Sequence, residues 1–250
     1  MNNNKLLTII LAVLLLIMFS LAGLLIYITD PVVTTTTDSE EKPVDNPSVD
    51  DVILSLTDDA GWEYIDKIYF VGDSTTWHFH KGGIDKSHIF VPDSLTLMLT
   101  SNIDTVIVGN KGLTIPEAIA DADCEIVIIT IGVNGADNFT ETKYKTYYKK
   151  LIDAIQEVSP DTKIILQSVF PVTKYYSDQD KGITNTGIDR LNEWAKDIAF
   201  EEGLKYLDTQ SILKDNNGAQ IEAYGEQDGV HMNADAYNAI IEYIKTHAIE

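Results

Sequence analysis

Two short segments far apart in the chain carry side chains suited to nucleophilic catalysis. Ser74 follows the strand-like run Lys67–Val71 after a Gly-Asp pair, and Asp228 precedes His231 by three positions near the C-terminus. A serine hydroxyl becomes a good nucleophile at neutral pH when a base takes its proton, and the base needs a partner that orients it and stabilises its charge. Ser74, His231 and Asp228 are therefore predicted to act as nucleophile, base and orienting acid.

Each segment also has an ordinary structural interpretation. Gly, Asp and Ser all favour turns, so the tripeptide that ends at Ser74 is typical of a turn as well. Asp228 also fits the cap of a helix, with His231 as a plain residue of its first turn. The catalytic interpretation gains weight because two further segments with suitable side chains lie between these two.

The two intermediate segments offer amide donors. Gly112 comes after the strand-like run Thr105–Val108, and Asn134 comes after the run Glu125–Ile131. Acyl transfer from an ester builds negative charge on an oxygen, which fixed, uncharged donors stabilise. The alternative is a loop glycine with unusual dihedral angles and a turn asparagine. Four suitable segments at four successive strand ends favour a single hydrolytic site.

With these segments the chain resembles the SGNH hydrolase superfamily, the GDSL-type esterases and lipases. The family's four blocks carry Ser, Gly, Asn and His, which match Ser74, Gly112, Asn134 and His231, with Asp228 in the Asp-x-x-His of the last block. The resemblance implies a serine esterase with the triad Ser74, His231 and Asp228. It also implies an oxyanion hole made of the Ser74 and Gly112 amides and the Asn134 side chain.

Two positions depart from the family pattern. Thr75 stands where the family name has Leu, and Gly135 follows Asn134 where many members have Asp. Neither change removes a catalytic group, although the second alters how Asn134 is held. Gly109 competes for the glycine role, but Gly112 fits the Gly-x-Thr spacing of the block better.

Side chains close to these blocks are candidates for the wall of the substrate pocket. They are Asp73, Thr75, Trp77, His78, Pro171 and Val230. His78 and His80 also suggest a metal, but no Cys or carboxylate cluster with ligand spacing accompanies them. We therefore expect neither a metal nor a cofactor. The single cysteine, Cys124, excludes an internal disulfide and is expected to serve packing.

The N-terminus predicts where the chemistry takes place. Residues 6–28 form an apolar run of 23 residues without charge, long enough to cross a bilayer as a helix. Lys5 precedes the run and acids follow it, so residues 1–5 are expected in the cytoplasm and the C-terminal domain outside. A cleaved signal peptide, with secretion, is the alternative, but its apolar region is usually about 7–15 residues long.

Composition separates a linker from a domain. Residues 29–61 are predicted to be an acidic linker containing Thr and Pro, and residues 62–250 a hydrolase domain. The formal charge of −21 divides into +1 for residues 1–29, −8 for 30–61 and −14 for 62–250. Nucleic acid and anionic lipid headgroups are disfavoured partners, because both bind clustered Lys and Arg. The sequence does not indicate an oligomeric state.

Strand-like runs alternate with helix-like stretches through the domain. Predicted strands lie at 67–71, 105–108, 125–131, 163–169 and 205–208, and the main predicted helices at 141–158, 187–202 and 234–249. This alternation predicts an α/β fold, a three-layer α/β/α sandwich around a five-stranded parallel sheet. The resemblance implies the flavodoxin-like version of this fold. Ligands of such sheets bind beyond the carboxyl ends of the strands, where the four blocks are expected to meet.

The sequence thus predicts hydrolysis of short acyl esters, above all acetyl, on carbohydrate or cell-wall glycan. The predicted surface anchor, the acidic domain and the lack of an evident apolar lid motivate this substrate class. An O-acyltransferase with the same site and a lysophospholipase- or thioesterase-type lipase are alternatives. A glycan-binding module without activity is disfavoured, because a degenerate copy usually loses one of the site residues, and this chain has all five.

Overall fold

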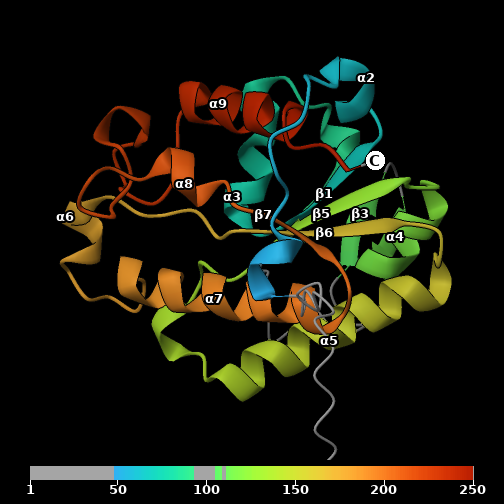
Figure 1. Cartoon of the computed structure of the whole chain (residues 1–250), viewed down its shortest axis with the longest axis horizontal. Coiled ribbons are helices and arrows are strands. Elements are labelled where there is room, and N and C mark those ends of the chain that lie inside the picture. The colour runs from blue at the N-terminus through green and yellow to red at the C-terminus, as the bar shows by residue number, and fades with distance from the viewer. Residues whose placement is uncertain (1–47, 93–104, 109–110, 250) are drawn as a thin grey trace, which may run out of the picture. The chain divides into compact units, whose positions relative to one another are not determined.

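The computed structural model describes residues 48–92, 105–108 and 111–249 (Figure 1). The chain divides into two units, Met1–Asn46 and Pro47–Glu250, and the described residues lie in the second. The predicted span at 6–28 and most of the predicted linker fall outside the described residues. Within the described ranges, no helix is both long and apolar enough to cross a bilayer.

A five-stranded parallel sheet forms the centre of the domain, as predicted. Its strand order is β2-β1-β5-β6-β7. The bounds are β1 Ile68–Gly72, β2 Ile89–Phe90, β5 Ile126–Thr130, β6 Lys163–Gln167 and β7 Lys205–Leu207. β1, β5, β6 and β7 coincide with predicted strands. In β1, β5 and β6 the signal is a run of mainly apolar residues, which suits strands that are buried on both faces.

The fifth predicted strand is wrong in its placement. Thr105–Val108 forms β3, which pairs antiparallel with β4, Lys111–Thr114, in a separate two-stranded sheet. Only two residues separate these strands, which suits a hairpin, whereas parallel neighbours need a crossover of a dozen residues or more. The edge position beside β1 belongs instead to β2, a strand of two residues that the sequence analysis did not predict.

Helices cover both faces of the sheet, as the layers in Figure 1 show. One face packs against α4, Ile115–Asp121, α5, Glu141–Val158, and α7, Asn185–Glu201; the other packs against α2, Gly61–Ile65, and α9, Ala234–Lys245. Short helices are α3 Ser74–Trp77, α6 Lys174–Ser177 and α8 Gln210–Leu213, with 3₁₀ turns at Val49–Val52, His78–Gly82, Lys86–His88, Ala136–Asn138 and Glu222–Tyr224. The predicted helix at 141–158 is confirmed residue for residue.

Strand residues alternate between the two apolar layers. Val127 and Ile129 face the layer of α4, α5 and α7, whereas Ile126 and Ile128 face the layer of α2 and α9. This alternation follows from the two-residue repeat of a strand. Both layers consist of buried apolar side chains, and they fix the positions of the strand ends.

The folded unit begins before residue 62, where the predicted domain starts. Ile53 bridges to Tyr206 of β7, and the Leu54 amide donates to the Tyr206 carbonyl at 2.8 Å. Val52 and Leu54 are buried. The last part of the predicted linker therefore packs on the domain, because its apolar side chains gain from burial against the sheet edge.

Candidate active site

Ser74 lies directly beyond the carboxyl end of β1, as the first residue of α3. Asp73 caps this helix: its Oδ1 accepts from the Thr75 amide at 3.0 Å and from the Thr75 hydroxyl at 2.7 Å. Asp73 and Thr75 are buried while Ser74 is exposed. The turn therefore buries Asp73 and Thr75 and leaves Ser74, which lies between them, exposed to solvent.

The same carboxylate joins β1 to the next strand end. Asp73 Oδ2 accepts from the Gly132 amide at 3.4 Å, just after β5. Gly132 has a φ of +141°, a conformation open to glycine, and an added Cβ would press on Leu191 and Tyr144. Burial raises the pKa of Asp73, although hydrogen bonds from Thr75 and from the Gly132 and Val133 amides oppose the rise. Asp73 is therefore a buried carboxylate that holds the turn, and its place in the pocket wall stays a prediction.

The structure brings Ser74, His231 and Asp228 together. His231 Nε2 lies 3.0 Å from Ser74 Oγ, and His231 Nδ1 lies 2.6 Å from Asp228 Oδ2. A neutral imidazole that faces a carboxylate carries its proton on that side, so Nδ1 donates to Asp228 and Nε2 is free to accept from the serine hydroxyl. The three side chains form one continuous line of hydrogen bonds.

Asp228 is held ionised in this arrangement. Its Oδ1 accepts from the Val230 and His231 amides, each at 2.9 Å. Burial alone would raise the pKa of Asp228, but the hydrogen bonds from the His231 ring and from these two amides lower it to about 2. The carboxylate is thus charged at neutral pH and fixes the orientation of the imidazole.

One helix positions both halves of this line. α9 begins at Ala234, three residues after His231, and is capped by the Asn233 side chain, which accepts from the Ala236 amide. From the same helix, the buried Tyr237 hydroxyl donates to the Thr75 carbonyl at 2.6 Å. Tyr237 was not predicted, and a tyrosine inside a helix gives no sequence signal for such a contact.

The Lys81 ammonium group fixes the loop that carries His231. Lys81 Nζ donates to Glu226 Oε1 and to the Met232 carbonyl, both at 2.9 Å. The Glu226 amide in turn donates to the His231 carbonyl at 2.9 Å. Lys81 and Glu226 lie 145 positions apart in the chain, so only the fold reveals this clamp.

A second imidazole packs beside the first. The ring of His78 lies 4.8 Å from that of His231, centre to centre, at an interplanar angle of 33°. Burial, together with the charges of Lys81 and His231, lowers the pKa of His78 to about 4. Its Nδ1 is buried without a hydrogen-bond partner among the described residues. At neutral pH, His78 is therefore an uncharged side chain that packs beside His231.

The predicted oxyanion donors fall in different places. Asn134 is exposed in the loop after β5, at a strand end next to that of Ser74, because Gly72 and Thr130 pair in register. Gly112 lies instead within β4, opposite Ile107 in the hairpin, and not beyond a strand of the parallel sheet. Its role as an oxyanion donor stays a prediction.

The remaining predicted wall residues divide by burial. Trp77 is exposed one helical turn after Ser74, with Lys86 Nζ 5.3 Å from the centre of its ring. Val230 is half-buried beside His231, whereas Thr75 and Pro171 are buried. Thr75 serves the Asp73 cap, so its side chain is unavailable to a ligand.

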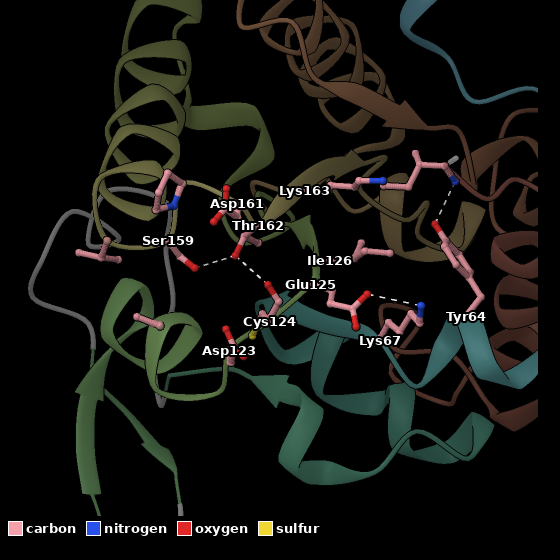
Figure 2. A pocket seen from close by; sticks show the side chains of 14 residues that line it. Tyr64, Lys67, Asp123, Cys124, Glu125, Ile126, Ser159, Asp161, Thr162 and Lys163 are labelled. Carbon is pink, nitrogen blue, oxygen red and sulfur yellow. Dashed lines mark hydrogen bonds and ion pairs between the residues drawn. The ribbon is translucent and has the colours of Figure 1, made fainter.

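The pocket in Figure 2 lies at the amino ends of the strands and has a volume of about 580 Å³. Several of its polar groups pair with one another: Lys67 with Glu125, and the Thr162 hydroxyl with the Cys124 carbonyl. Burial raises the pKa of the Cys124 thiol to about 12, which fits the predicted packing role. Across the described residues, no group of three His, Cys, Asp or Glu could hold a metal ion.

Residues 70–239, which include the whole hydrogen-bonded line, match the model of the GDSL-like lipase/acylhydrolase family. The chain belongs to this family. The predicted resemblance is thereby confirmed, and the protein is an ester-hydrolysing enzyme. Among curated proteins, none matches this acylhydrolase.

Solved structures show the same fold at low sequence identity. A Streptococcus pneumonia protein named after platelet activating factor is 18% identical, with a TM-score of 0.56, over 72% of this chain and 82% of its own. A GDSL-like lipase from Bacteroides thetaiotaomicron VPI-5482 is 16% identical, with a TM-score of 0.51, over 70% and 85%. A G-D-S-L family protein from Desulfitobacterium hafniense is 20% identical, with a TM-score of 0.50, over 72% and 98%.

Proposed function

We propose that this acylhydrolase is a serine esterase that removes short acyl groups, above all acetyl, from carbohydrate or cell-wall glycan. The observation that carries the proposal is the line of hydrogen bonds from Asp228 through His231 to Ser74. This is the geometry that a nucleophile, a general base and its orienting carboxylate require.

In the first step, His231 Nε2 takes the proton of Ser74 while Oγ attacks the ester carbonyl carbon. The charge that develops on the carbonyl oxygen is stabilised by the Ser74 amide, the Asn134 side chain and, as predicted, the Gly112 amide. Collapse of the tetrahedral intermediate breaks the ester bond, and His231 gives its proton to the departing sugar oxygen. An acyl group remains on Ser74.

In the second step, water replaces the sugar. His231 takes a proton from the water, which attacks the acyl carbonyl, and returns that proton to Ser74 Oγ as the acid leaves. Asp228 stabilises the imidazolium in both steps without taking a proton. Loss of one oxyanion donor is expected to lower turnover by roughly 10²–10³.

The exposed surface favours a polar substrate over a lipid. Large apolar side chains are exposed at single places on separate elements of the described chain: Leu56, Trp62, Trp77, Val158, Tyr175 and Phe200. A lipid-binding face would need a contiguous apolar patch. Trp77 is the one of these next to the serine in sequence, and a single indole ring suits the apolar face of a sugar.

The proposal includes the place of action. The apolar run at 6–28 is proposed as an uncleaved anchor that holds the domain outside the cytoplasmic membrane. Fractionation of cells that make the full chain tests this. Full-length protein in the membrane fraction, cut by external protease, is expected, whereas a shortened protein in the medium would contradict the anchor.

Ester hydrolysis tests the chemistry. The full chain is expected to cleave p-nitrophenyl acetate faster than longer p-nitrophenyl esters and to release acetate from acetylated glycans. Ser74→Ala is expected to abolish both activities. Cleavage of long-chain lipid esters without acetate release would favour the lipase alternative, and equal activity in both proteins would exclude Ser74 as nucleophile.

A transferase gives a different product. With an acyl donor and a sugar acceptor both present, an O-acyltransferase would form the acylated sugar faster than free acid. The esterase proposed here is expected to form mainly free acid under these conditions.

A further inference from the structure

A second cavity is lined by Asn134 and shares no lining residue with the pocket in Figure 2. It has a volume of about 440 Å³ and is lined by residues of the loop after β5, the start of α5 and the loop before α7. Lys143 and Lys181 are among its lining residues, and Phe139 and Ile183 contribute apolar surface. We call it the lysine pocket, defined by Asn134, Phe139, Lys143, Lys181 and Ile183.

The two lysines differ from most others in this protein. Neither ammonium group has a hydrogen-bond or ion-pair partner within the described part of the chain. In contrast, Lys145, Lys149 and Lys214 each contact a carboxylate. Two exposed ammonium groups without partners on one cavity leave positive charge available to a ligand.

The carboxylate of Asp137, in the loop after β5, does not neutralise this charge. Asp137 lies in the same loop, and its amide donates to the Gly182 carbonyl. Its Oδ1 accepts from the Thr184 hydroxyl at 2.7 Å, and its Oδ2 is buried. The Asp137 side chain is therefore turned into the protein, beneath the loop that carries Lys181.

The rest of the domain is acidic, so positive charge on one cavity bears on which ligands can bind there. Residues 62–250 carry a net charge of −14, which repels anionic molecules at long range. Beyond about one Debye length, roughly 8 Å at physiological salt, that repulsion is screened, so local cations decide whether an anionic group binds. Half-buried Phe139 and Ile183 add a surface that suits the apolar face of a sugar ring.

We propose that the lysine pocket binds an anionic group, a carboxylate or a phosphate, on the acylated glycan. This inference rests on the proposed esterase function, because Asn134 is both a wall of the pocket and a proposed oxyanion donor. An acidic sugar with its charge between Lys143 and Lys181 would present its ester near Asn134. The enzyme is thus selective for acidic over neutral acylated glycans.

Three probes with one shared sugar test this selectivity. They are mono-O-acetylated methyl glucoside, its glucuronoside and its 6-phosphate, which differ only at carbon 6. With the full chain at low salt, KM for an anionic probe is expected to be about tenfold lower than for the neutral probe. The difference is expected to shrink at high salt. Preference for one anionic probe over the other identifies whether the pocket binds a carboxylate or a phosphate.

Paired variants locate the effect. Lys143→Gln with Lys181→Gln is expected to bring the ratio of kcat/KM for anionic and neutral probes close to one. Lys150→Gln with Lys205→Gln removes the same charge from the outer face of α5 and the amino end of β7, and is expected to keep the ratio. Equal rates on all probes in the unaltered protein, or an unchanged ratio in the first variant, would overturn the proposal.

A binding measurement separates this inference from the esterase proposal. Methyl glucuronoside is titrated into Ser74→Ala with and without the two lysine substitutions. Binding that depends on the lysines supports the pocket even where no ester is cleaved, and absence of binding overturns it. Failure to cleave p-nitrophenyl acetate, in contrast, counts against the esterase alone.

Discussion

The carboxyl edge of the parallel sheet, where its strands end, and the amino edge, where they begin, differ in how their polar groups are used. At the carboxyl edge, a polar contact joins a solvent-exposed nucleophile to a base, Ser74 to His231. At the amino edge, several groups that line the larger cavity pair with one another, such as Lys67 with Glu125 and the Ile249 amide with the Tyr64 hydroxyl (Figure 2). Cavity size therefore does not locate the chemistry here.

What separates the edges is the state of their candidate nucleophiles. Ser74 is exposed, with an imidazole 3.0 Å from its oxygen. Cys124 is buried, and burial raises the pKa of its thiol to about 12, so that it stays protonated. A nucleophile needs access to substrate and a base within reach, and only the carboxyl edge offers both.

The largest expected difference between the edges concerns carboxylates. Asp228→Asn is expected to lower kcat by up to about 10⁴, because an amide no longer holds His231 with its proton on Nδ1. Asp161→Asn is the matched change at the amino edge, in the wall of the larger pocket, and is expected to leave kcat unchanged. Steady-state kinetics with p-nitrophenyl acetate measure both, and equal losses would contradict the assignment of Asp228.

A smaller effect is expected from His78 through pH. Its pKa in the folded protein is about 4, below the ordinary value of 6.5. Between these values the unfolded chain binds more protons, so the His78 contribution makes the fold less stable as pH falls from about 6.5 to 4. Below about 4 both states are protonated and the penalty stays constant.

Urea unfolding at pH 7.5, 5.5 and 4.5 checks this expectation. His78→Phe is expected to lose less stability than the unaltered protein over this range, because it has no imidazole to charge beside His231. Parallel curves for the two proteins would show that His78 takes up its proton without strain in the fold.

The smallest effect is expected at the amino edge. Lys67 Nζ lies 3.5 Å from Glu125, and both side chains are more than half exposed. Lys67→Gln is expected to change the free energy of unfolding by less than about 1 kcal/mol and to leave kcat unaffected. A larger loss of stability would show that the ion pair contributes more than its exposure indicates, and any loss of activity would show that the two edges are coupled through the sheet.

Long elements were predictable because their patterns are strong. The helix at Glu141–Val158 repeats apolar residues at helical spacing, and β5 begins with an unbroken run of Ile and Val residues. β2, Ile89–Phe90, was missed because two residues give no period to read. Thr105–Val108 was assigned to the wrong sheet because its composition suits either kind of pairing.

The same error affected one site residue. Gly112 was expected beyond a parallel strand, and lies in a hairpin strand instead. Lys81 and Tyr237 were not predicted at all, since each acts through a contact with a residue more than 140 positions away. Such contacts leave no local pattern in the chain.

The sequence by itself determined the contact of His231 with Asp228. Three positions separate them, so one turn of the chain brings imidazole and carboxylate within 2.6 Å. Only the tertiary structure decided that Ser74, 157 positions away, completes the line. It also decided that His78 packs against His231 and that two lysines share a cavity beside Asn134. Local spacing fixes neighbours along the chain, whereas the packing of α9 on the sheet fixes neighbours across it.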